Sequence, residues 1–140
     1  MKHLEIKGII PPVVTPMNAD ETVNIAELRN QVERQIQGGV HGIFPFGTNG
    51  EGYILSLKEK EEILEATIDQ VKGRIPVYAG TGCISTRDTV YMSKRAEEMD
   101  AAIAALEINA DVENVASTTT SKVAKGSVLG VLRDWVPDAS

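Results

Sequence analysis

Short apolar runs alternate with amphipathic stretches along this chain, and this alternation constrains its fold more than any other feature. The runs at residues 8–14, 40–46 and 75–79 begin at intervals of about 33 residues, and a fourth follows at 101–108. Strands that alternate with helices at this spacing form βαβ units with a parallel sheet and right-handed crossovers. We therefore expect an α/β fold of three to five βα units, in one domain spanning residues 1–140.

Three helices are expected between and after these strands. The first begins at about residue 24 and ends at the Gly38-Gly39 pair, with apolar residues at helical spacing. Ser56 and Glu59 form a capping-box pattern at the start of the second, which ends near residues 72–73. Ser85 opens the third, which extends through Met99.

Composition excludes several classes of function. The chain has 140 residues, of which 42% are hydrophobic and 24% charged, and its net charge of −6 disfavours nucleic-acid or acidic-membrane binding. No apolar stretch approaches the roughly 20 residues of a membrane span, and the N-terminus lacks the apolar core of a signal peptide. Cys83 is the only cysteine, so an internal disulfide is impossible. We expect a cytoplasmic protein without a metal or cofactor.

The turn Gly47-Thr48-Asn49-Gly50 is the strongest candidate for a binding site. It follows directly after the strand expected at residues 40–46. Glycines tolerate a left-handed backbone and close approach, so such a turn can direct successive N–H groups and the Thr48 hydroxyl toward one small anion. The same pattern also occurs in ordinary strand-to-helix turns, and the turn alone leaves both interpretations open.

Other chemically capable residues have simpler interpretations. Glu51 adjoins the turn as a base or, more commonly, as a cap. Cys83 has no evident histidine partner, since the chain contains only His3 and His41, and we expect it to be a passive small residue. Residues 80–82 (GTG) lack the third glycine and the downstream acid of a dinucleotide-binding fingerprint.

Four segments together resemble one known family. They are residues 8–16 (GIIPPVVTP), 42–51 (GIFPFGTNGE), 55–60 (LSLKEK) and 76–82 (PVYAGTG), in the order and at the spacing of the dihydrodipicolinate synthase and N-acetylneuraminate lyase family. The resemblance covers residues 8–99. It implies a (β/α)8 barrel, and an aldolase-type lyase reaction in which a lysine on a later strand forms a Schiff base with pyruvate or another 2-keto acid.

The resemblance implies a role for the glycine turn. Thr48 and Asn49, with the backbone of Gly47 and Gly50, correspond to the loop that binds the pyruvate carboxylate in this family. Family members usually carry threonine at the second position, where a hydroxyl joins a proton relay in the synthase branch. Asn49 can hold a carboxylate but cannot relay a proton as a hydroxyl does. This favours an aldolase acting on another sugar acid over the synthase proper.

Residues 100–140 depart from the family pattern. No tyrosine follows Tyr91, and the only later lysines, Lys122 and Lys125, stand in a Ser/Thr-rich stretch rather than on an apolar strand. A Schiff-base lysine must be desolvated or lie near another cation. We therefore assign no catalytic residue, and we expect a truncated or chimeric chain that keeps the family's carboxylate-binding turn.

Two architectures and two functions follow. Three or four βα units cannot close a barrel, so we expect either half of a (β/α)8 barrel completed by a second copy or an open flavodoxin-like sandwich covered by residues 128–136. We expect a homo-oligomer, since a half-barrel requires a second copy. The first function is a lyase-family protein that binds a 2-keto acid, weakly if at all. The second is a non-catalytic α/β scaffold.

Overall fold

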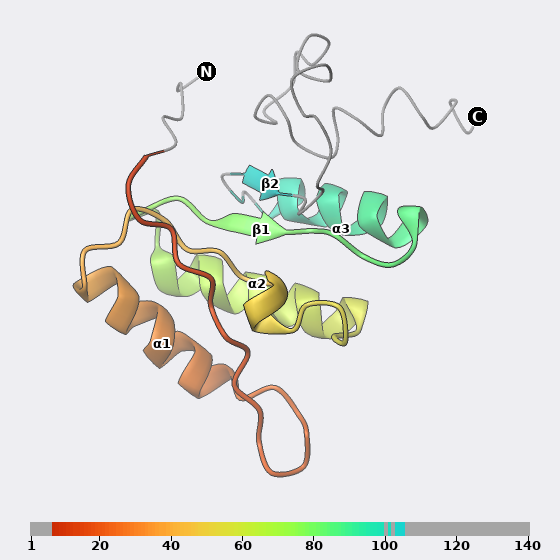
Figure 1. Cartoon of the computed structure of the whole chain (residues 1–140), viewed down its shortest axis with the longest axis horizontal. Helices are drawn as coiled ribbons and strands as arrows, with labels where there is room; N and C mark the ends of the chain where they lie inside the picture. Colours follow the sequence, from red (N-terminus) through yellow and green to blue (C-terminus); the bar gives the residue numbers. More distant parts are fainter. Residues whose placement is uncertain (1–6, 100, 102, 106–140) are drawn as a thin grey trace, which may run out of the picture.

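The computed structural model describes residues 7–99, 101 and 103–105 of the chain (Figure 1). In chain order its elements are α1 (Ile25–Gln37), the 3-10 turn η1 (Thr48–Gly50), α2 (Leu57–Val71), β1 (Tyr78–Gly80), α3 (Thr86–Glu98) and β2 (Ile103–Ala105). The helices expected after residue 108, and Lys122 and Lys125 with them, lie outside the described residues.

The three expected helices are confirmed, and polar side chains fix where each begins. The side chains of Asn24 and Ser85 accept hydrogen bonds from backbone N–H groups three residues later, in α1 and α3. At α2 the Ser56 hydroxyl accepts from the N–H of Glu59, whose carboxylate accepts from the N–H of Ser56 at 2.8 Å. This is a complete capping box, and it satisfies two backbone donors that a helix start otherwise leaves unpaired.

The extended segments pair in parallel and in sequential order. Phe44 bridges Pro12 on one side, and its neighbour Ile43 bridges Val77 on the other. β1 pairs in turn with β2, with Tyr78 opposite Ile103. The second segment therefore lies between the first and the third. A flavodoxin-like sheet places the first strand in that position, so the pairing order favours the barrel arrangement and not the open sandwich.

The first two expected strands form less regular structure than the sequence predicts. Residues 8–14 and 40–46 meet only at isolated bridges, although the Val13 N–H donates to the Phe44 carbonyl at 2.9 Å. Pro11 and Pro12 contribute no N–H to a ladder, which explains the interruption. The third strand is also displaced, because the ladder with β2 covers Tyr78–Gly80 whereas we expected residues 75–79.

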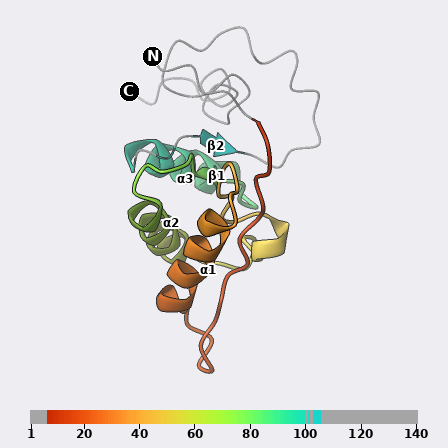
Figure 2. The ribbon, with the colours of Figure 1, turned by 90° about the vertical axis from the view of Figure 1, so that its left-hand side faces the viewer.

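The helices pack side by side along one face of these segments (Figure 2). α1 lies against α2, and α2 lies against α3. The largest fully buried apolar side chains come from both the helices and the extended segments: Val13, Leu28, Val32, Ile43, Ile63, Leu64, Val71 and Met92. This single core fixes the ends of the segments, where the candidate site lies.

One ion pair ties α1 to the loop after α2 and makes stability pH-dependent. The Arg74 guanidinium donates two hydrogen bonds to Glu33, at 2.7 and 3.0 Å, and together with Gln70 it lowers the pKa of that carboxyl from 4.5 to about 2. A lowered folded-state pKa contributes stability above the unfolded pKa and loses it as pH falls.

We expect Glu33→Gln to be less stable than the parent at pH 7. The difference should shrink between about pH 5 and pH 2, because the parent loses the contribution of Glu33 over that window. Urea unfolding at a series of pH values measures it. Parallel stability curves for the two proteins would contradict the assignment.

Candidate functional site

The Gly47-Thr48-Asn49-Gly50 turn lies at the carboxyl end of the second extended segment, as the sequence predicts. Residues Thr48–Gly50 form η1. Phe46 and Glu51, which stand directly before and after the four-residue turn, have left-handed φ angles of 68° and 52°. The left-handed positions are therefore the two flanking residues and not the glycines, because Gly47 has a φ of −63°. A buried phenylalanine in this conformation costs of order 1 kcal/mol or more and persists because the surrounding contacts fix it.

Gly50 is required because backbone passes directly beside it. A Cβ at this position would lie 2.6 Å from the Val13 carbonyl oxygen. The Gly50 carbonyl also accepts a hydrogen bond from the Thr15 hydroxyl at 2.7 Å. The end of the first segment thus clamps the turn, a contact between residues 35 positions apart.

The hydrogen bonds of the turn decide which groups can meet a ligand. The N–H groups of Gly50 and Glu51 donate to the carbonyls of Gly47 and Thr48, at 2.9 and 3.0 Å. Gly47 and Gly50 are buried, whereas the Thr48 and Asn49 side chains are exposed. The glycines therefore shape the turn, and the Thr48 hydroxyl and the Asn49 amide are the groups placed to contact a carboxylate.

The structure also places the other residues that the sequence singled out. Glu51 is exposed at the end of η1. The Nδ1 atom of His41 accepts the N–H of Ile9 at 3.0 Å, which is a structural contact, and His3 lies outside the described residues. Thr81 is buried, and its hydroxyl accepts from Ser93 at 2.9 Å.

Comparison with known proteins decides the family. Residues 5–109 match the dihydrodipicolinate synthetase family. The chain belongs to this family. The match extends beyond the resemblance over residues 8–99 at both ends, and it includes β2.

The relatives are lyases that match over the same part of the chain. An uncharacterised DapA-like lyase of Halobacterium salinarum is 40% identical over 98 residues, which are 70% of this chain and 32% of the relative. A 4-hydroxy-tetrahydrodipicolinate synthase of Methanopyrus kandleri is 41% identical over 98 residues, or 69% of this chain and 33% of the relative. The chain thus spans about a third of the length of these relatives.

A solved structure confirms the family fold. The chloride-inhibited dihydrodipicolinate synthase of Acinetobacter baumannii, complexed with pyruvate, superposes with a TM-score of 0.70 and 37% identity. The match covers 73% of this chain and 35% of that one. The dihydrodipicolinate synthetase family folds as a (β/α)8 barrel, and the described residues form a partial α/β unit of it.

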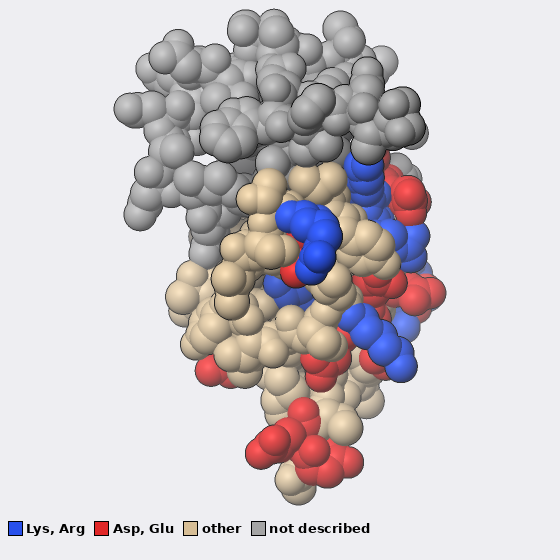
Figure 3. Space-filling view, turned by 90° about the vertical axis from the view of Figure 1, so that its right-hand side faces the viewer, with Lys and Arg blue, Asp and Glu red and all other residues tan. Residues whose placement is uncertain are grey.

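The family places its chemistry at the carboxyl ends of barrel strands, which is where this chain presents the turn. Figure 3 shows the side of the molecule on which α2 and α3 begin, and uncharged residues form most of that surface, with basic side chains near its middle. In residues 7–99, 101 and 103–105, no three His, Cys, Asp or Glu side chains are placed so that together they could hold a metal ion. None of the helices described is long and apolar enough to cross a membrane.

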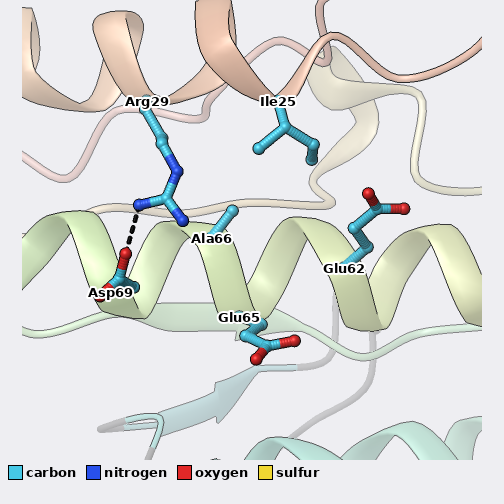
Figure 4. A pocket seen from close by; sticks show the side chains of 6 residues that line it. All are labelled: Ile25, Arg29, Glu62, Glu65, Ala66 and Asp69. Atoms are coloured by element: carbon cyan, nitrogen blue, oxygen red, sulfur yellow. Dashed lines mark hydrogen bonds and ion pairs between the residues drawn. The ribbon is translucent and has the colours of Figure 1, made fainter.

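A separate pocket of about 350 Å³ lies between α1 and α2 (Figure 4). Its lining includes three carboxylates, and Arg29 reaches from α1 to pair with Asp69 of α2. Three carboxylates against one already paired arginine disfavour an anionic ligand. This pocket is therefore not an alternative to the turn as a carboxylate site.

Sequence reasoning missed the structural roles of two residues. Thr15 belongs to the resemblance segment 8–16 without a role assigned from the sequence, yet its hydroxyl clamps the turn. Lys60 was included only in the family resemblance, yet its side chain is 2% exposed. Lys60 lies three residues before Ile63 and four before Leu64, which places it on the buried face of α2. This helical spacing could have predicted its burial from the sequence.

Proposed function

We propose that this chain binds the carboxylate of a small 2-keto acid, with pyruvate as the simplest case, at the turn Gly47-Thr48-Asn49-Gly50. The observation that carries the proposal is the exposure of Thr48 and Asn49 on a turn clamped by Thr15. A hydroxyl and an amide can both donate to a carboxylate, and charge-assisted hydrogen bonds of this kind are the stronger ones. Pyruvate bound to the Acinetobacter relative supports this choice of ligand class.

We assign none of the lysines of this chain to Schiff-base chemistry at the turn. Lys60 is buried, but its amine contacts Gly82 and Cys83. Lys122 and Lys125 stand in a polar stretch of the sequence, whereas a Schiff-base lysine is activated by desolvation or by a nearby cation. We therefore assign the chain as a derivative of a pyruvate-dependent lyase that is inactive by itself, in a cytoplasmic setting.

Asn49 indicates which branch of the family this chain derives from. An amide in place of the usual second hydroxyl removes a proton-relay group and keeps a carboxylate donor. This supports descent from an aldolase of another sugar acid and not from the synthase proper. The sequence beyond residue 109 is proposed to be foreign to the family, and a natural full-length gene with the same C-terminal sequence would disprove that.

A second candidate function is a non-catalytic scaffold that self-associates as a half-barrel. It is favoured by the first segment, where Ile9 and Val14 are 66% and 50% exposed. Within the described residues this segment pairs only on the side of the second segment, and an unpaired apolar edge favours association with another copy. Sedimentation would show whether the chain forms the dimer that this second function requires, and a monomer would contradict it.

The test of the proposed function is a pyruvate titration followed by amide NMR shifts of the turn. We expect shifts centred on Thr48 and Asn49, and about tenfold weaker binding for Thr48→Val, because a hydrogen bond to a charged group is lost. Thr48→Ser keeps the hydroxyl and is the matched control. Equal affinity of the valine and serine variants would overturn the assignment.

A further inference from the structure

Lys60 extends from the first turn of α2 to the loop that follows β1. Its side chain is 2% exposed, and its Nζ lies 3.2 Å from the Cys83 sulfur and 3.3 Å from the Gly82 carbonyl oxygen. An ammonium has three N–H donors, and neither of these acceptors is a carboxylate. No ion pair of Lys60 occurs among the described residues. Lys60 acts on a carboxylate only through its charge, as the smallest of the causes that lower the pKa of Asp88. A buried cation without a carboxylate in direct contact is costly.

Cys83 is held in place and is reachable from solvent. Its N–H donates to the Thr89 hydroxyl at 3.0 Å, and its sulfur contacts the Thr81 carbonyl oxygen at 3.6 Å. The residue is half-buried, whereas the Lys60 amine beside it is enclosed. A small oxidant can therefore reach the sulfur, while the amine is shielded from reagents in bulk solution.

We propose that Lys60 and Cys83 form a modification site in which a hydroperoxide converts the contact into a covalent sulfur–nitrogen bond. Hydrogen peroxide first oxidises the thiol to a sulfenic acid and is itself reduced to water. One proton of the Lys60 ammonium first passes to solvent, and the lone pair of the neutral amine then attacks this sulfur, so that the S–O bond breaks as the N–S bond forms. The departing hydroxide takes a second proton from the nitrogen and leaves as water. The product is a sulfenamide that ties α2 to the loop before α3.

The contact distance favours this step over competing reactions. Sulfenic acids condense with neighbouring nitrogen or thiol nucleophiles. The chain has no second cysteine, so an internal disulfide is excluded. The amine is already in contact with the sulfur, which gives it the advantage of an intramolecular reaction.

The experiment treats the folded 140-residue protein with hydrogen peroxide and measures its intact mass. We expect a species lighter than the parent by two hydrogen atoms, which resists thiol alkylation and returns to the parent mass with dithiothreitol. After trypsin, residues 59–72 should be joined to residues 75–87, because a modified Lys60 is not cleaved. A product carrying only added oxygen, or a thiol that remains unmodified, would overturn the proposal.

Three comparisons isolate the pair. Lys60→Leu should lose the lighter species and accumulate sulfinic acid at Cys83. Lys58→Leu, at an exposed lysine of the same helix turn, should retain the cross-link in full. The third comparison oxidises the parent protein in urea, so it does not depend on whether a variant folds. We expect no cross-link in the unfolded protein. An equal yield of the lighter species in urea would contradict a site built by the fold.

Discussion

Leu64→Ala lowers the free energy of unfolding by about 2–5 kcal/mol, the range for a buried leucine that leaves a cavity. Leu64 is 0% exposed and lies in the middle of α2, the helix that packs against both α1 and α3. Truncation therefore leaves a cavity in the core cluster to which all three helices contribute. Urea unfolding followed by circular dichroism measures the change.

The neighbouring position provides the control for this substitution. Glu65 is exposed on the same helix, and Glu65→Ala should change the free energy of unfolding by no more than about 0.5 kcal/mol. If Leu64→Ala and Glu65→Ala lowered the free energy of unfolding equally, α2 would not be the centre of a packed core.

Gly50→Ala destabilises the protein by about 1–3 kcal/mol and removes the proposed 2-keto-acid binding, the second large effect we expect. The added Cβ meets the Val13 carbonyl oxygen at 2.6 Å, and this atom belongs to backbone that cannot rotate away. The turn must move from the first segment, which also breaks the hydrogen bond from Thr15. Unfolding and the pyruvate titration measure the two effects on one sample.

Asn49→Ala separates binding from stability at the adjacent position. Asn49 is exposed, so its truncation should leave the unfolding free energy within about 0.5 kcal/mol while it weakens pyruvate binding. If Gly50→Ala left the free energy of unfolding unchanged, the close approach of the Val13 backbone would not be what holds the turn in place. Unchanged binding in Asn49→Ala would remove this residue from the site.

The helices were predictable because their signals are local. Asn24, Ser56 and Ser85 each bond to a backbone N–H three residues on, so a few neighbouring residues determine where each helix begins. The extended segments depend on partners 25 or more residues away, since Tyr78 pairs with Ile103 and the bridges between these segments span still longer separations, and residues 8–14 contain two prolines that interrupt pairing. Strand bounds were therefore less predictable than helix bounds.

The location of the candidate site was predictable, but its internal construction was not. The sequence placed the turn correctly after the second segment, and the family resemblance covered it. The left-handed residues proved to be Phe46 and Glu51, because tertiary contacts rather than intrinsic preference impose those angles. The Thr15 clamp and the Lys60–Cys83 contact join residues distant in sequence, and no local pattern encodes such contacts.

Borohydride trapping with pyruvate tests most directly whether this chain keeps the binding turn without the chemistry of its family. The folded 140-residue protein is incubated with pyruvate and sodium borohydride, and its intact mass and lysine peptides are measured. We expect an unchanged mass in a sample that still shows pyruvate-dependent shifts at Thr48 and Asn49. A reduced adduct on one lysine, whether Lys60, Lys122 or Lys125, would reveal an imine-forming site and restore the chain to the active lyases.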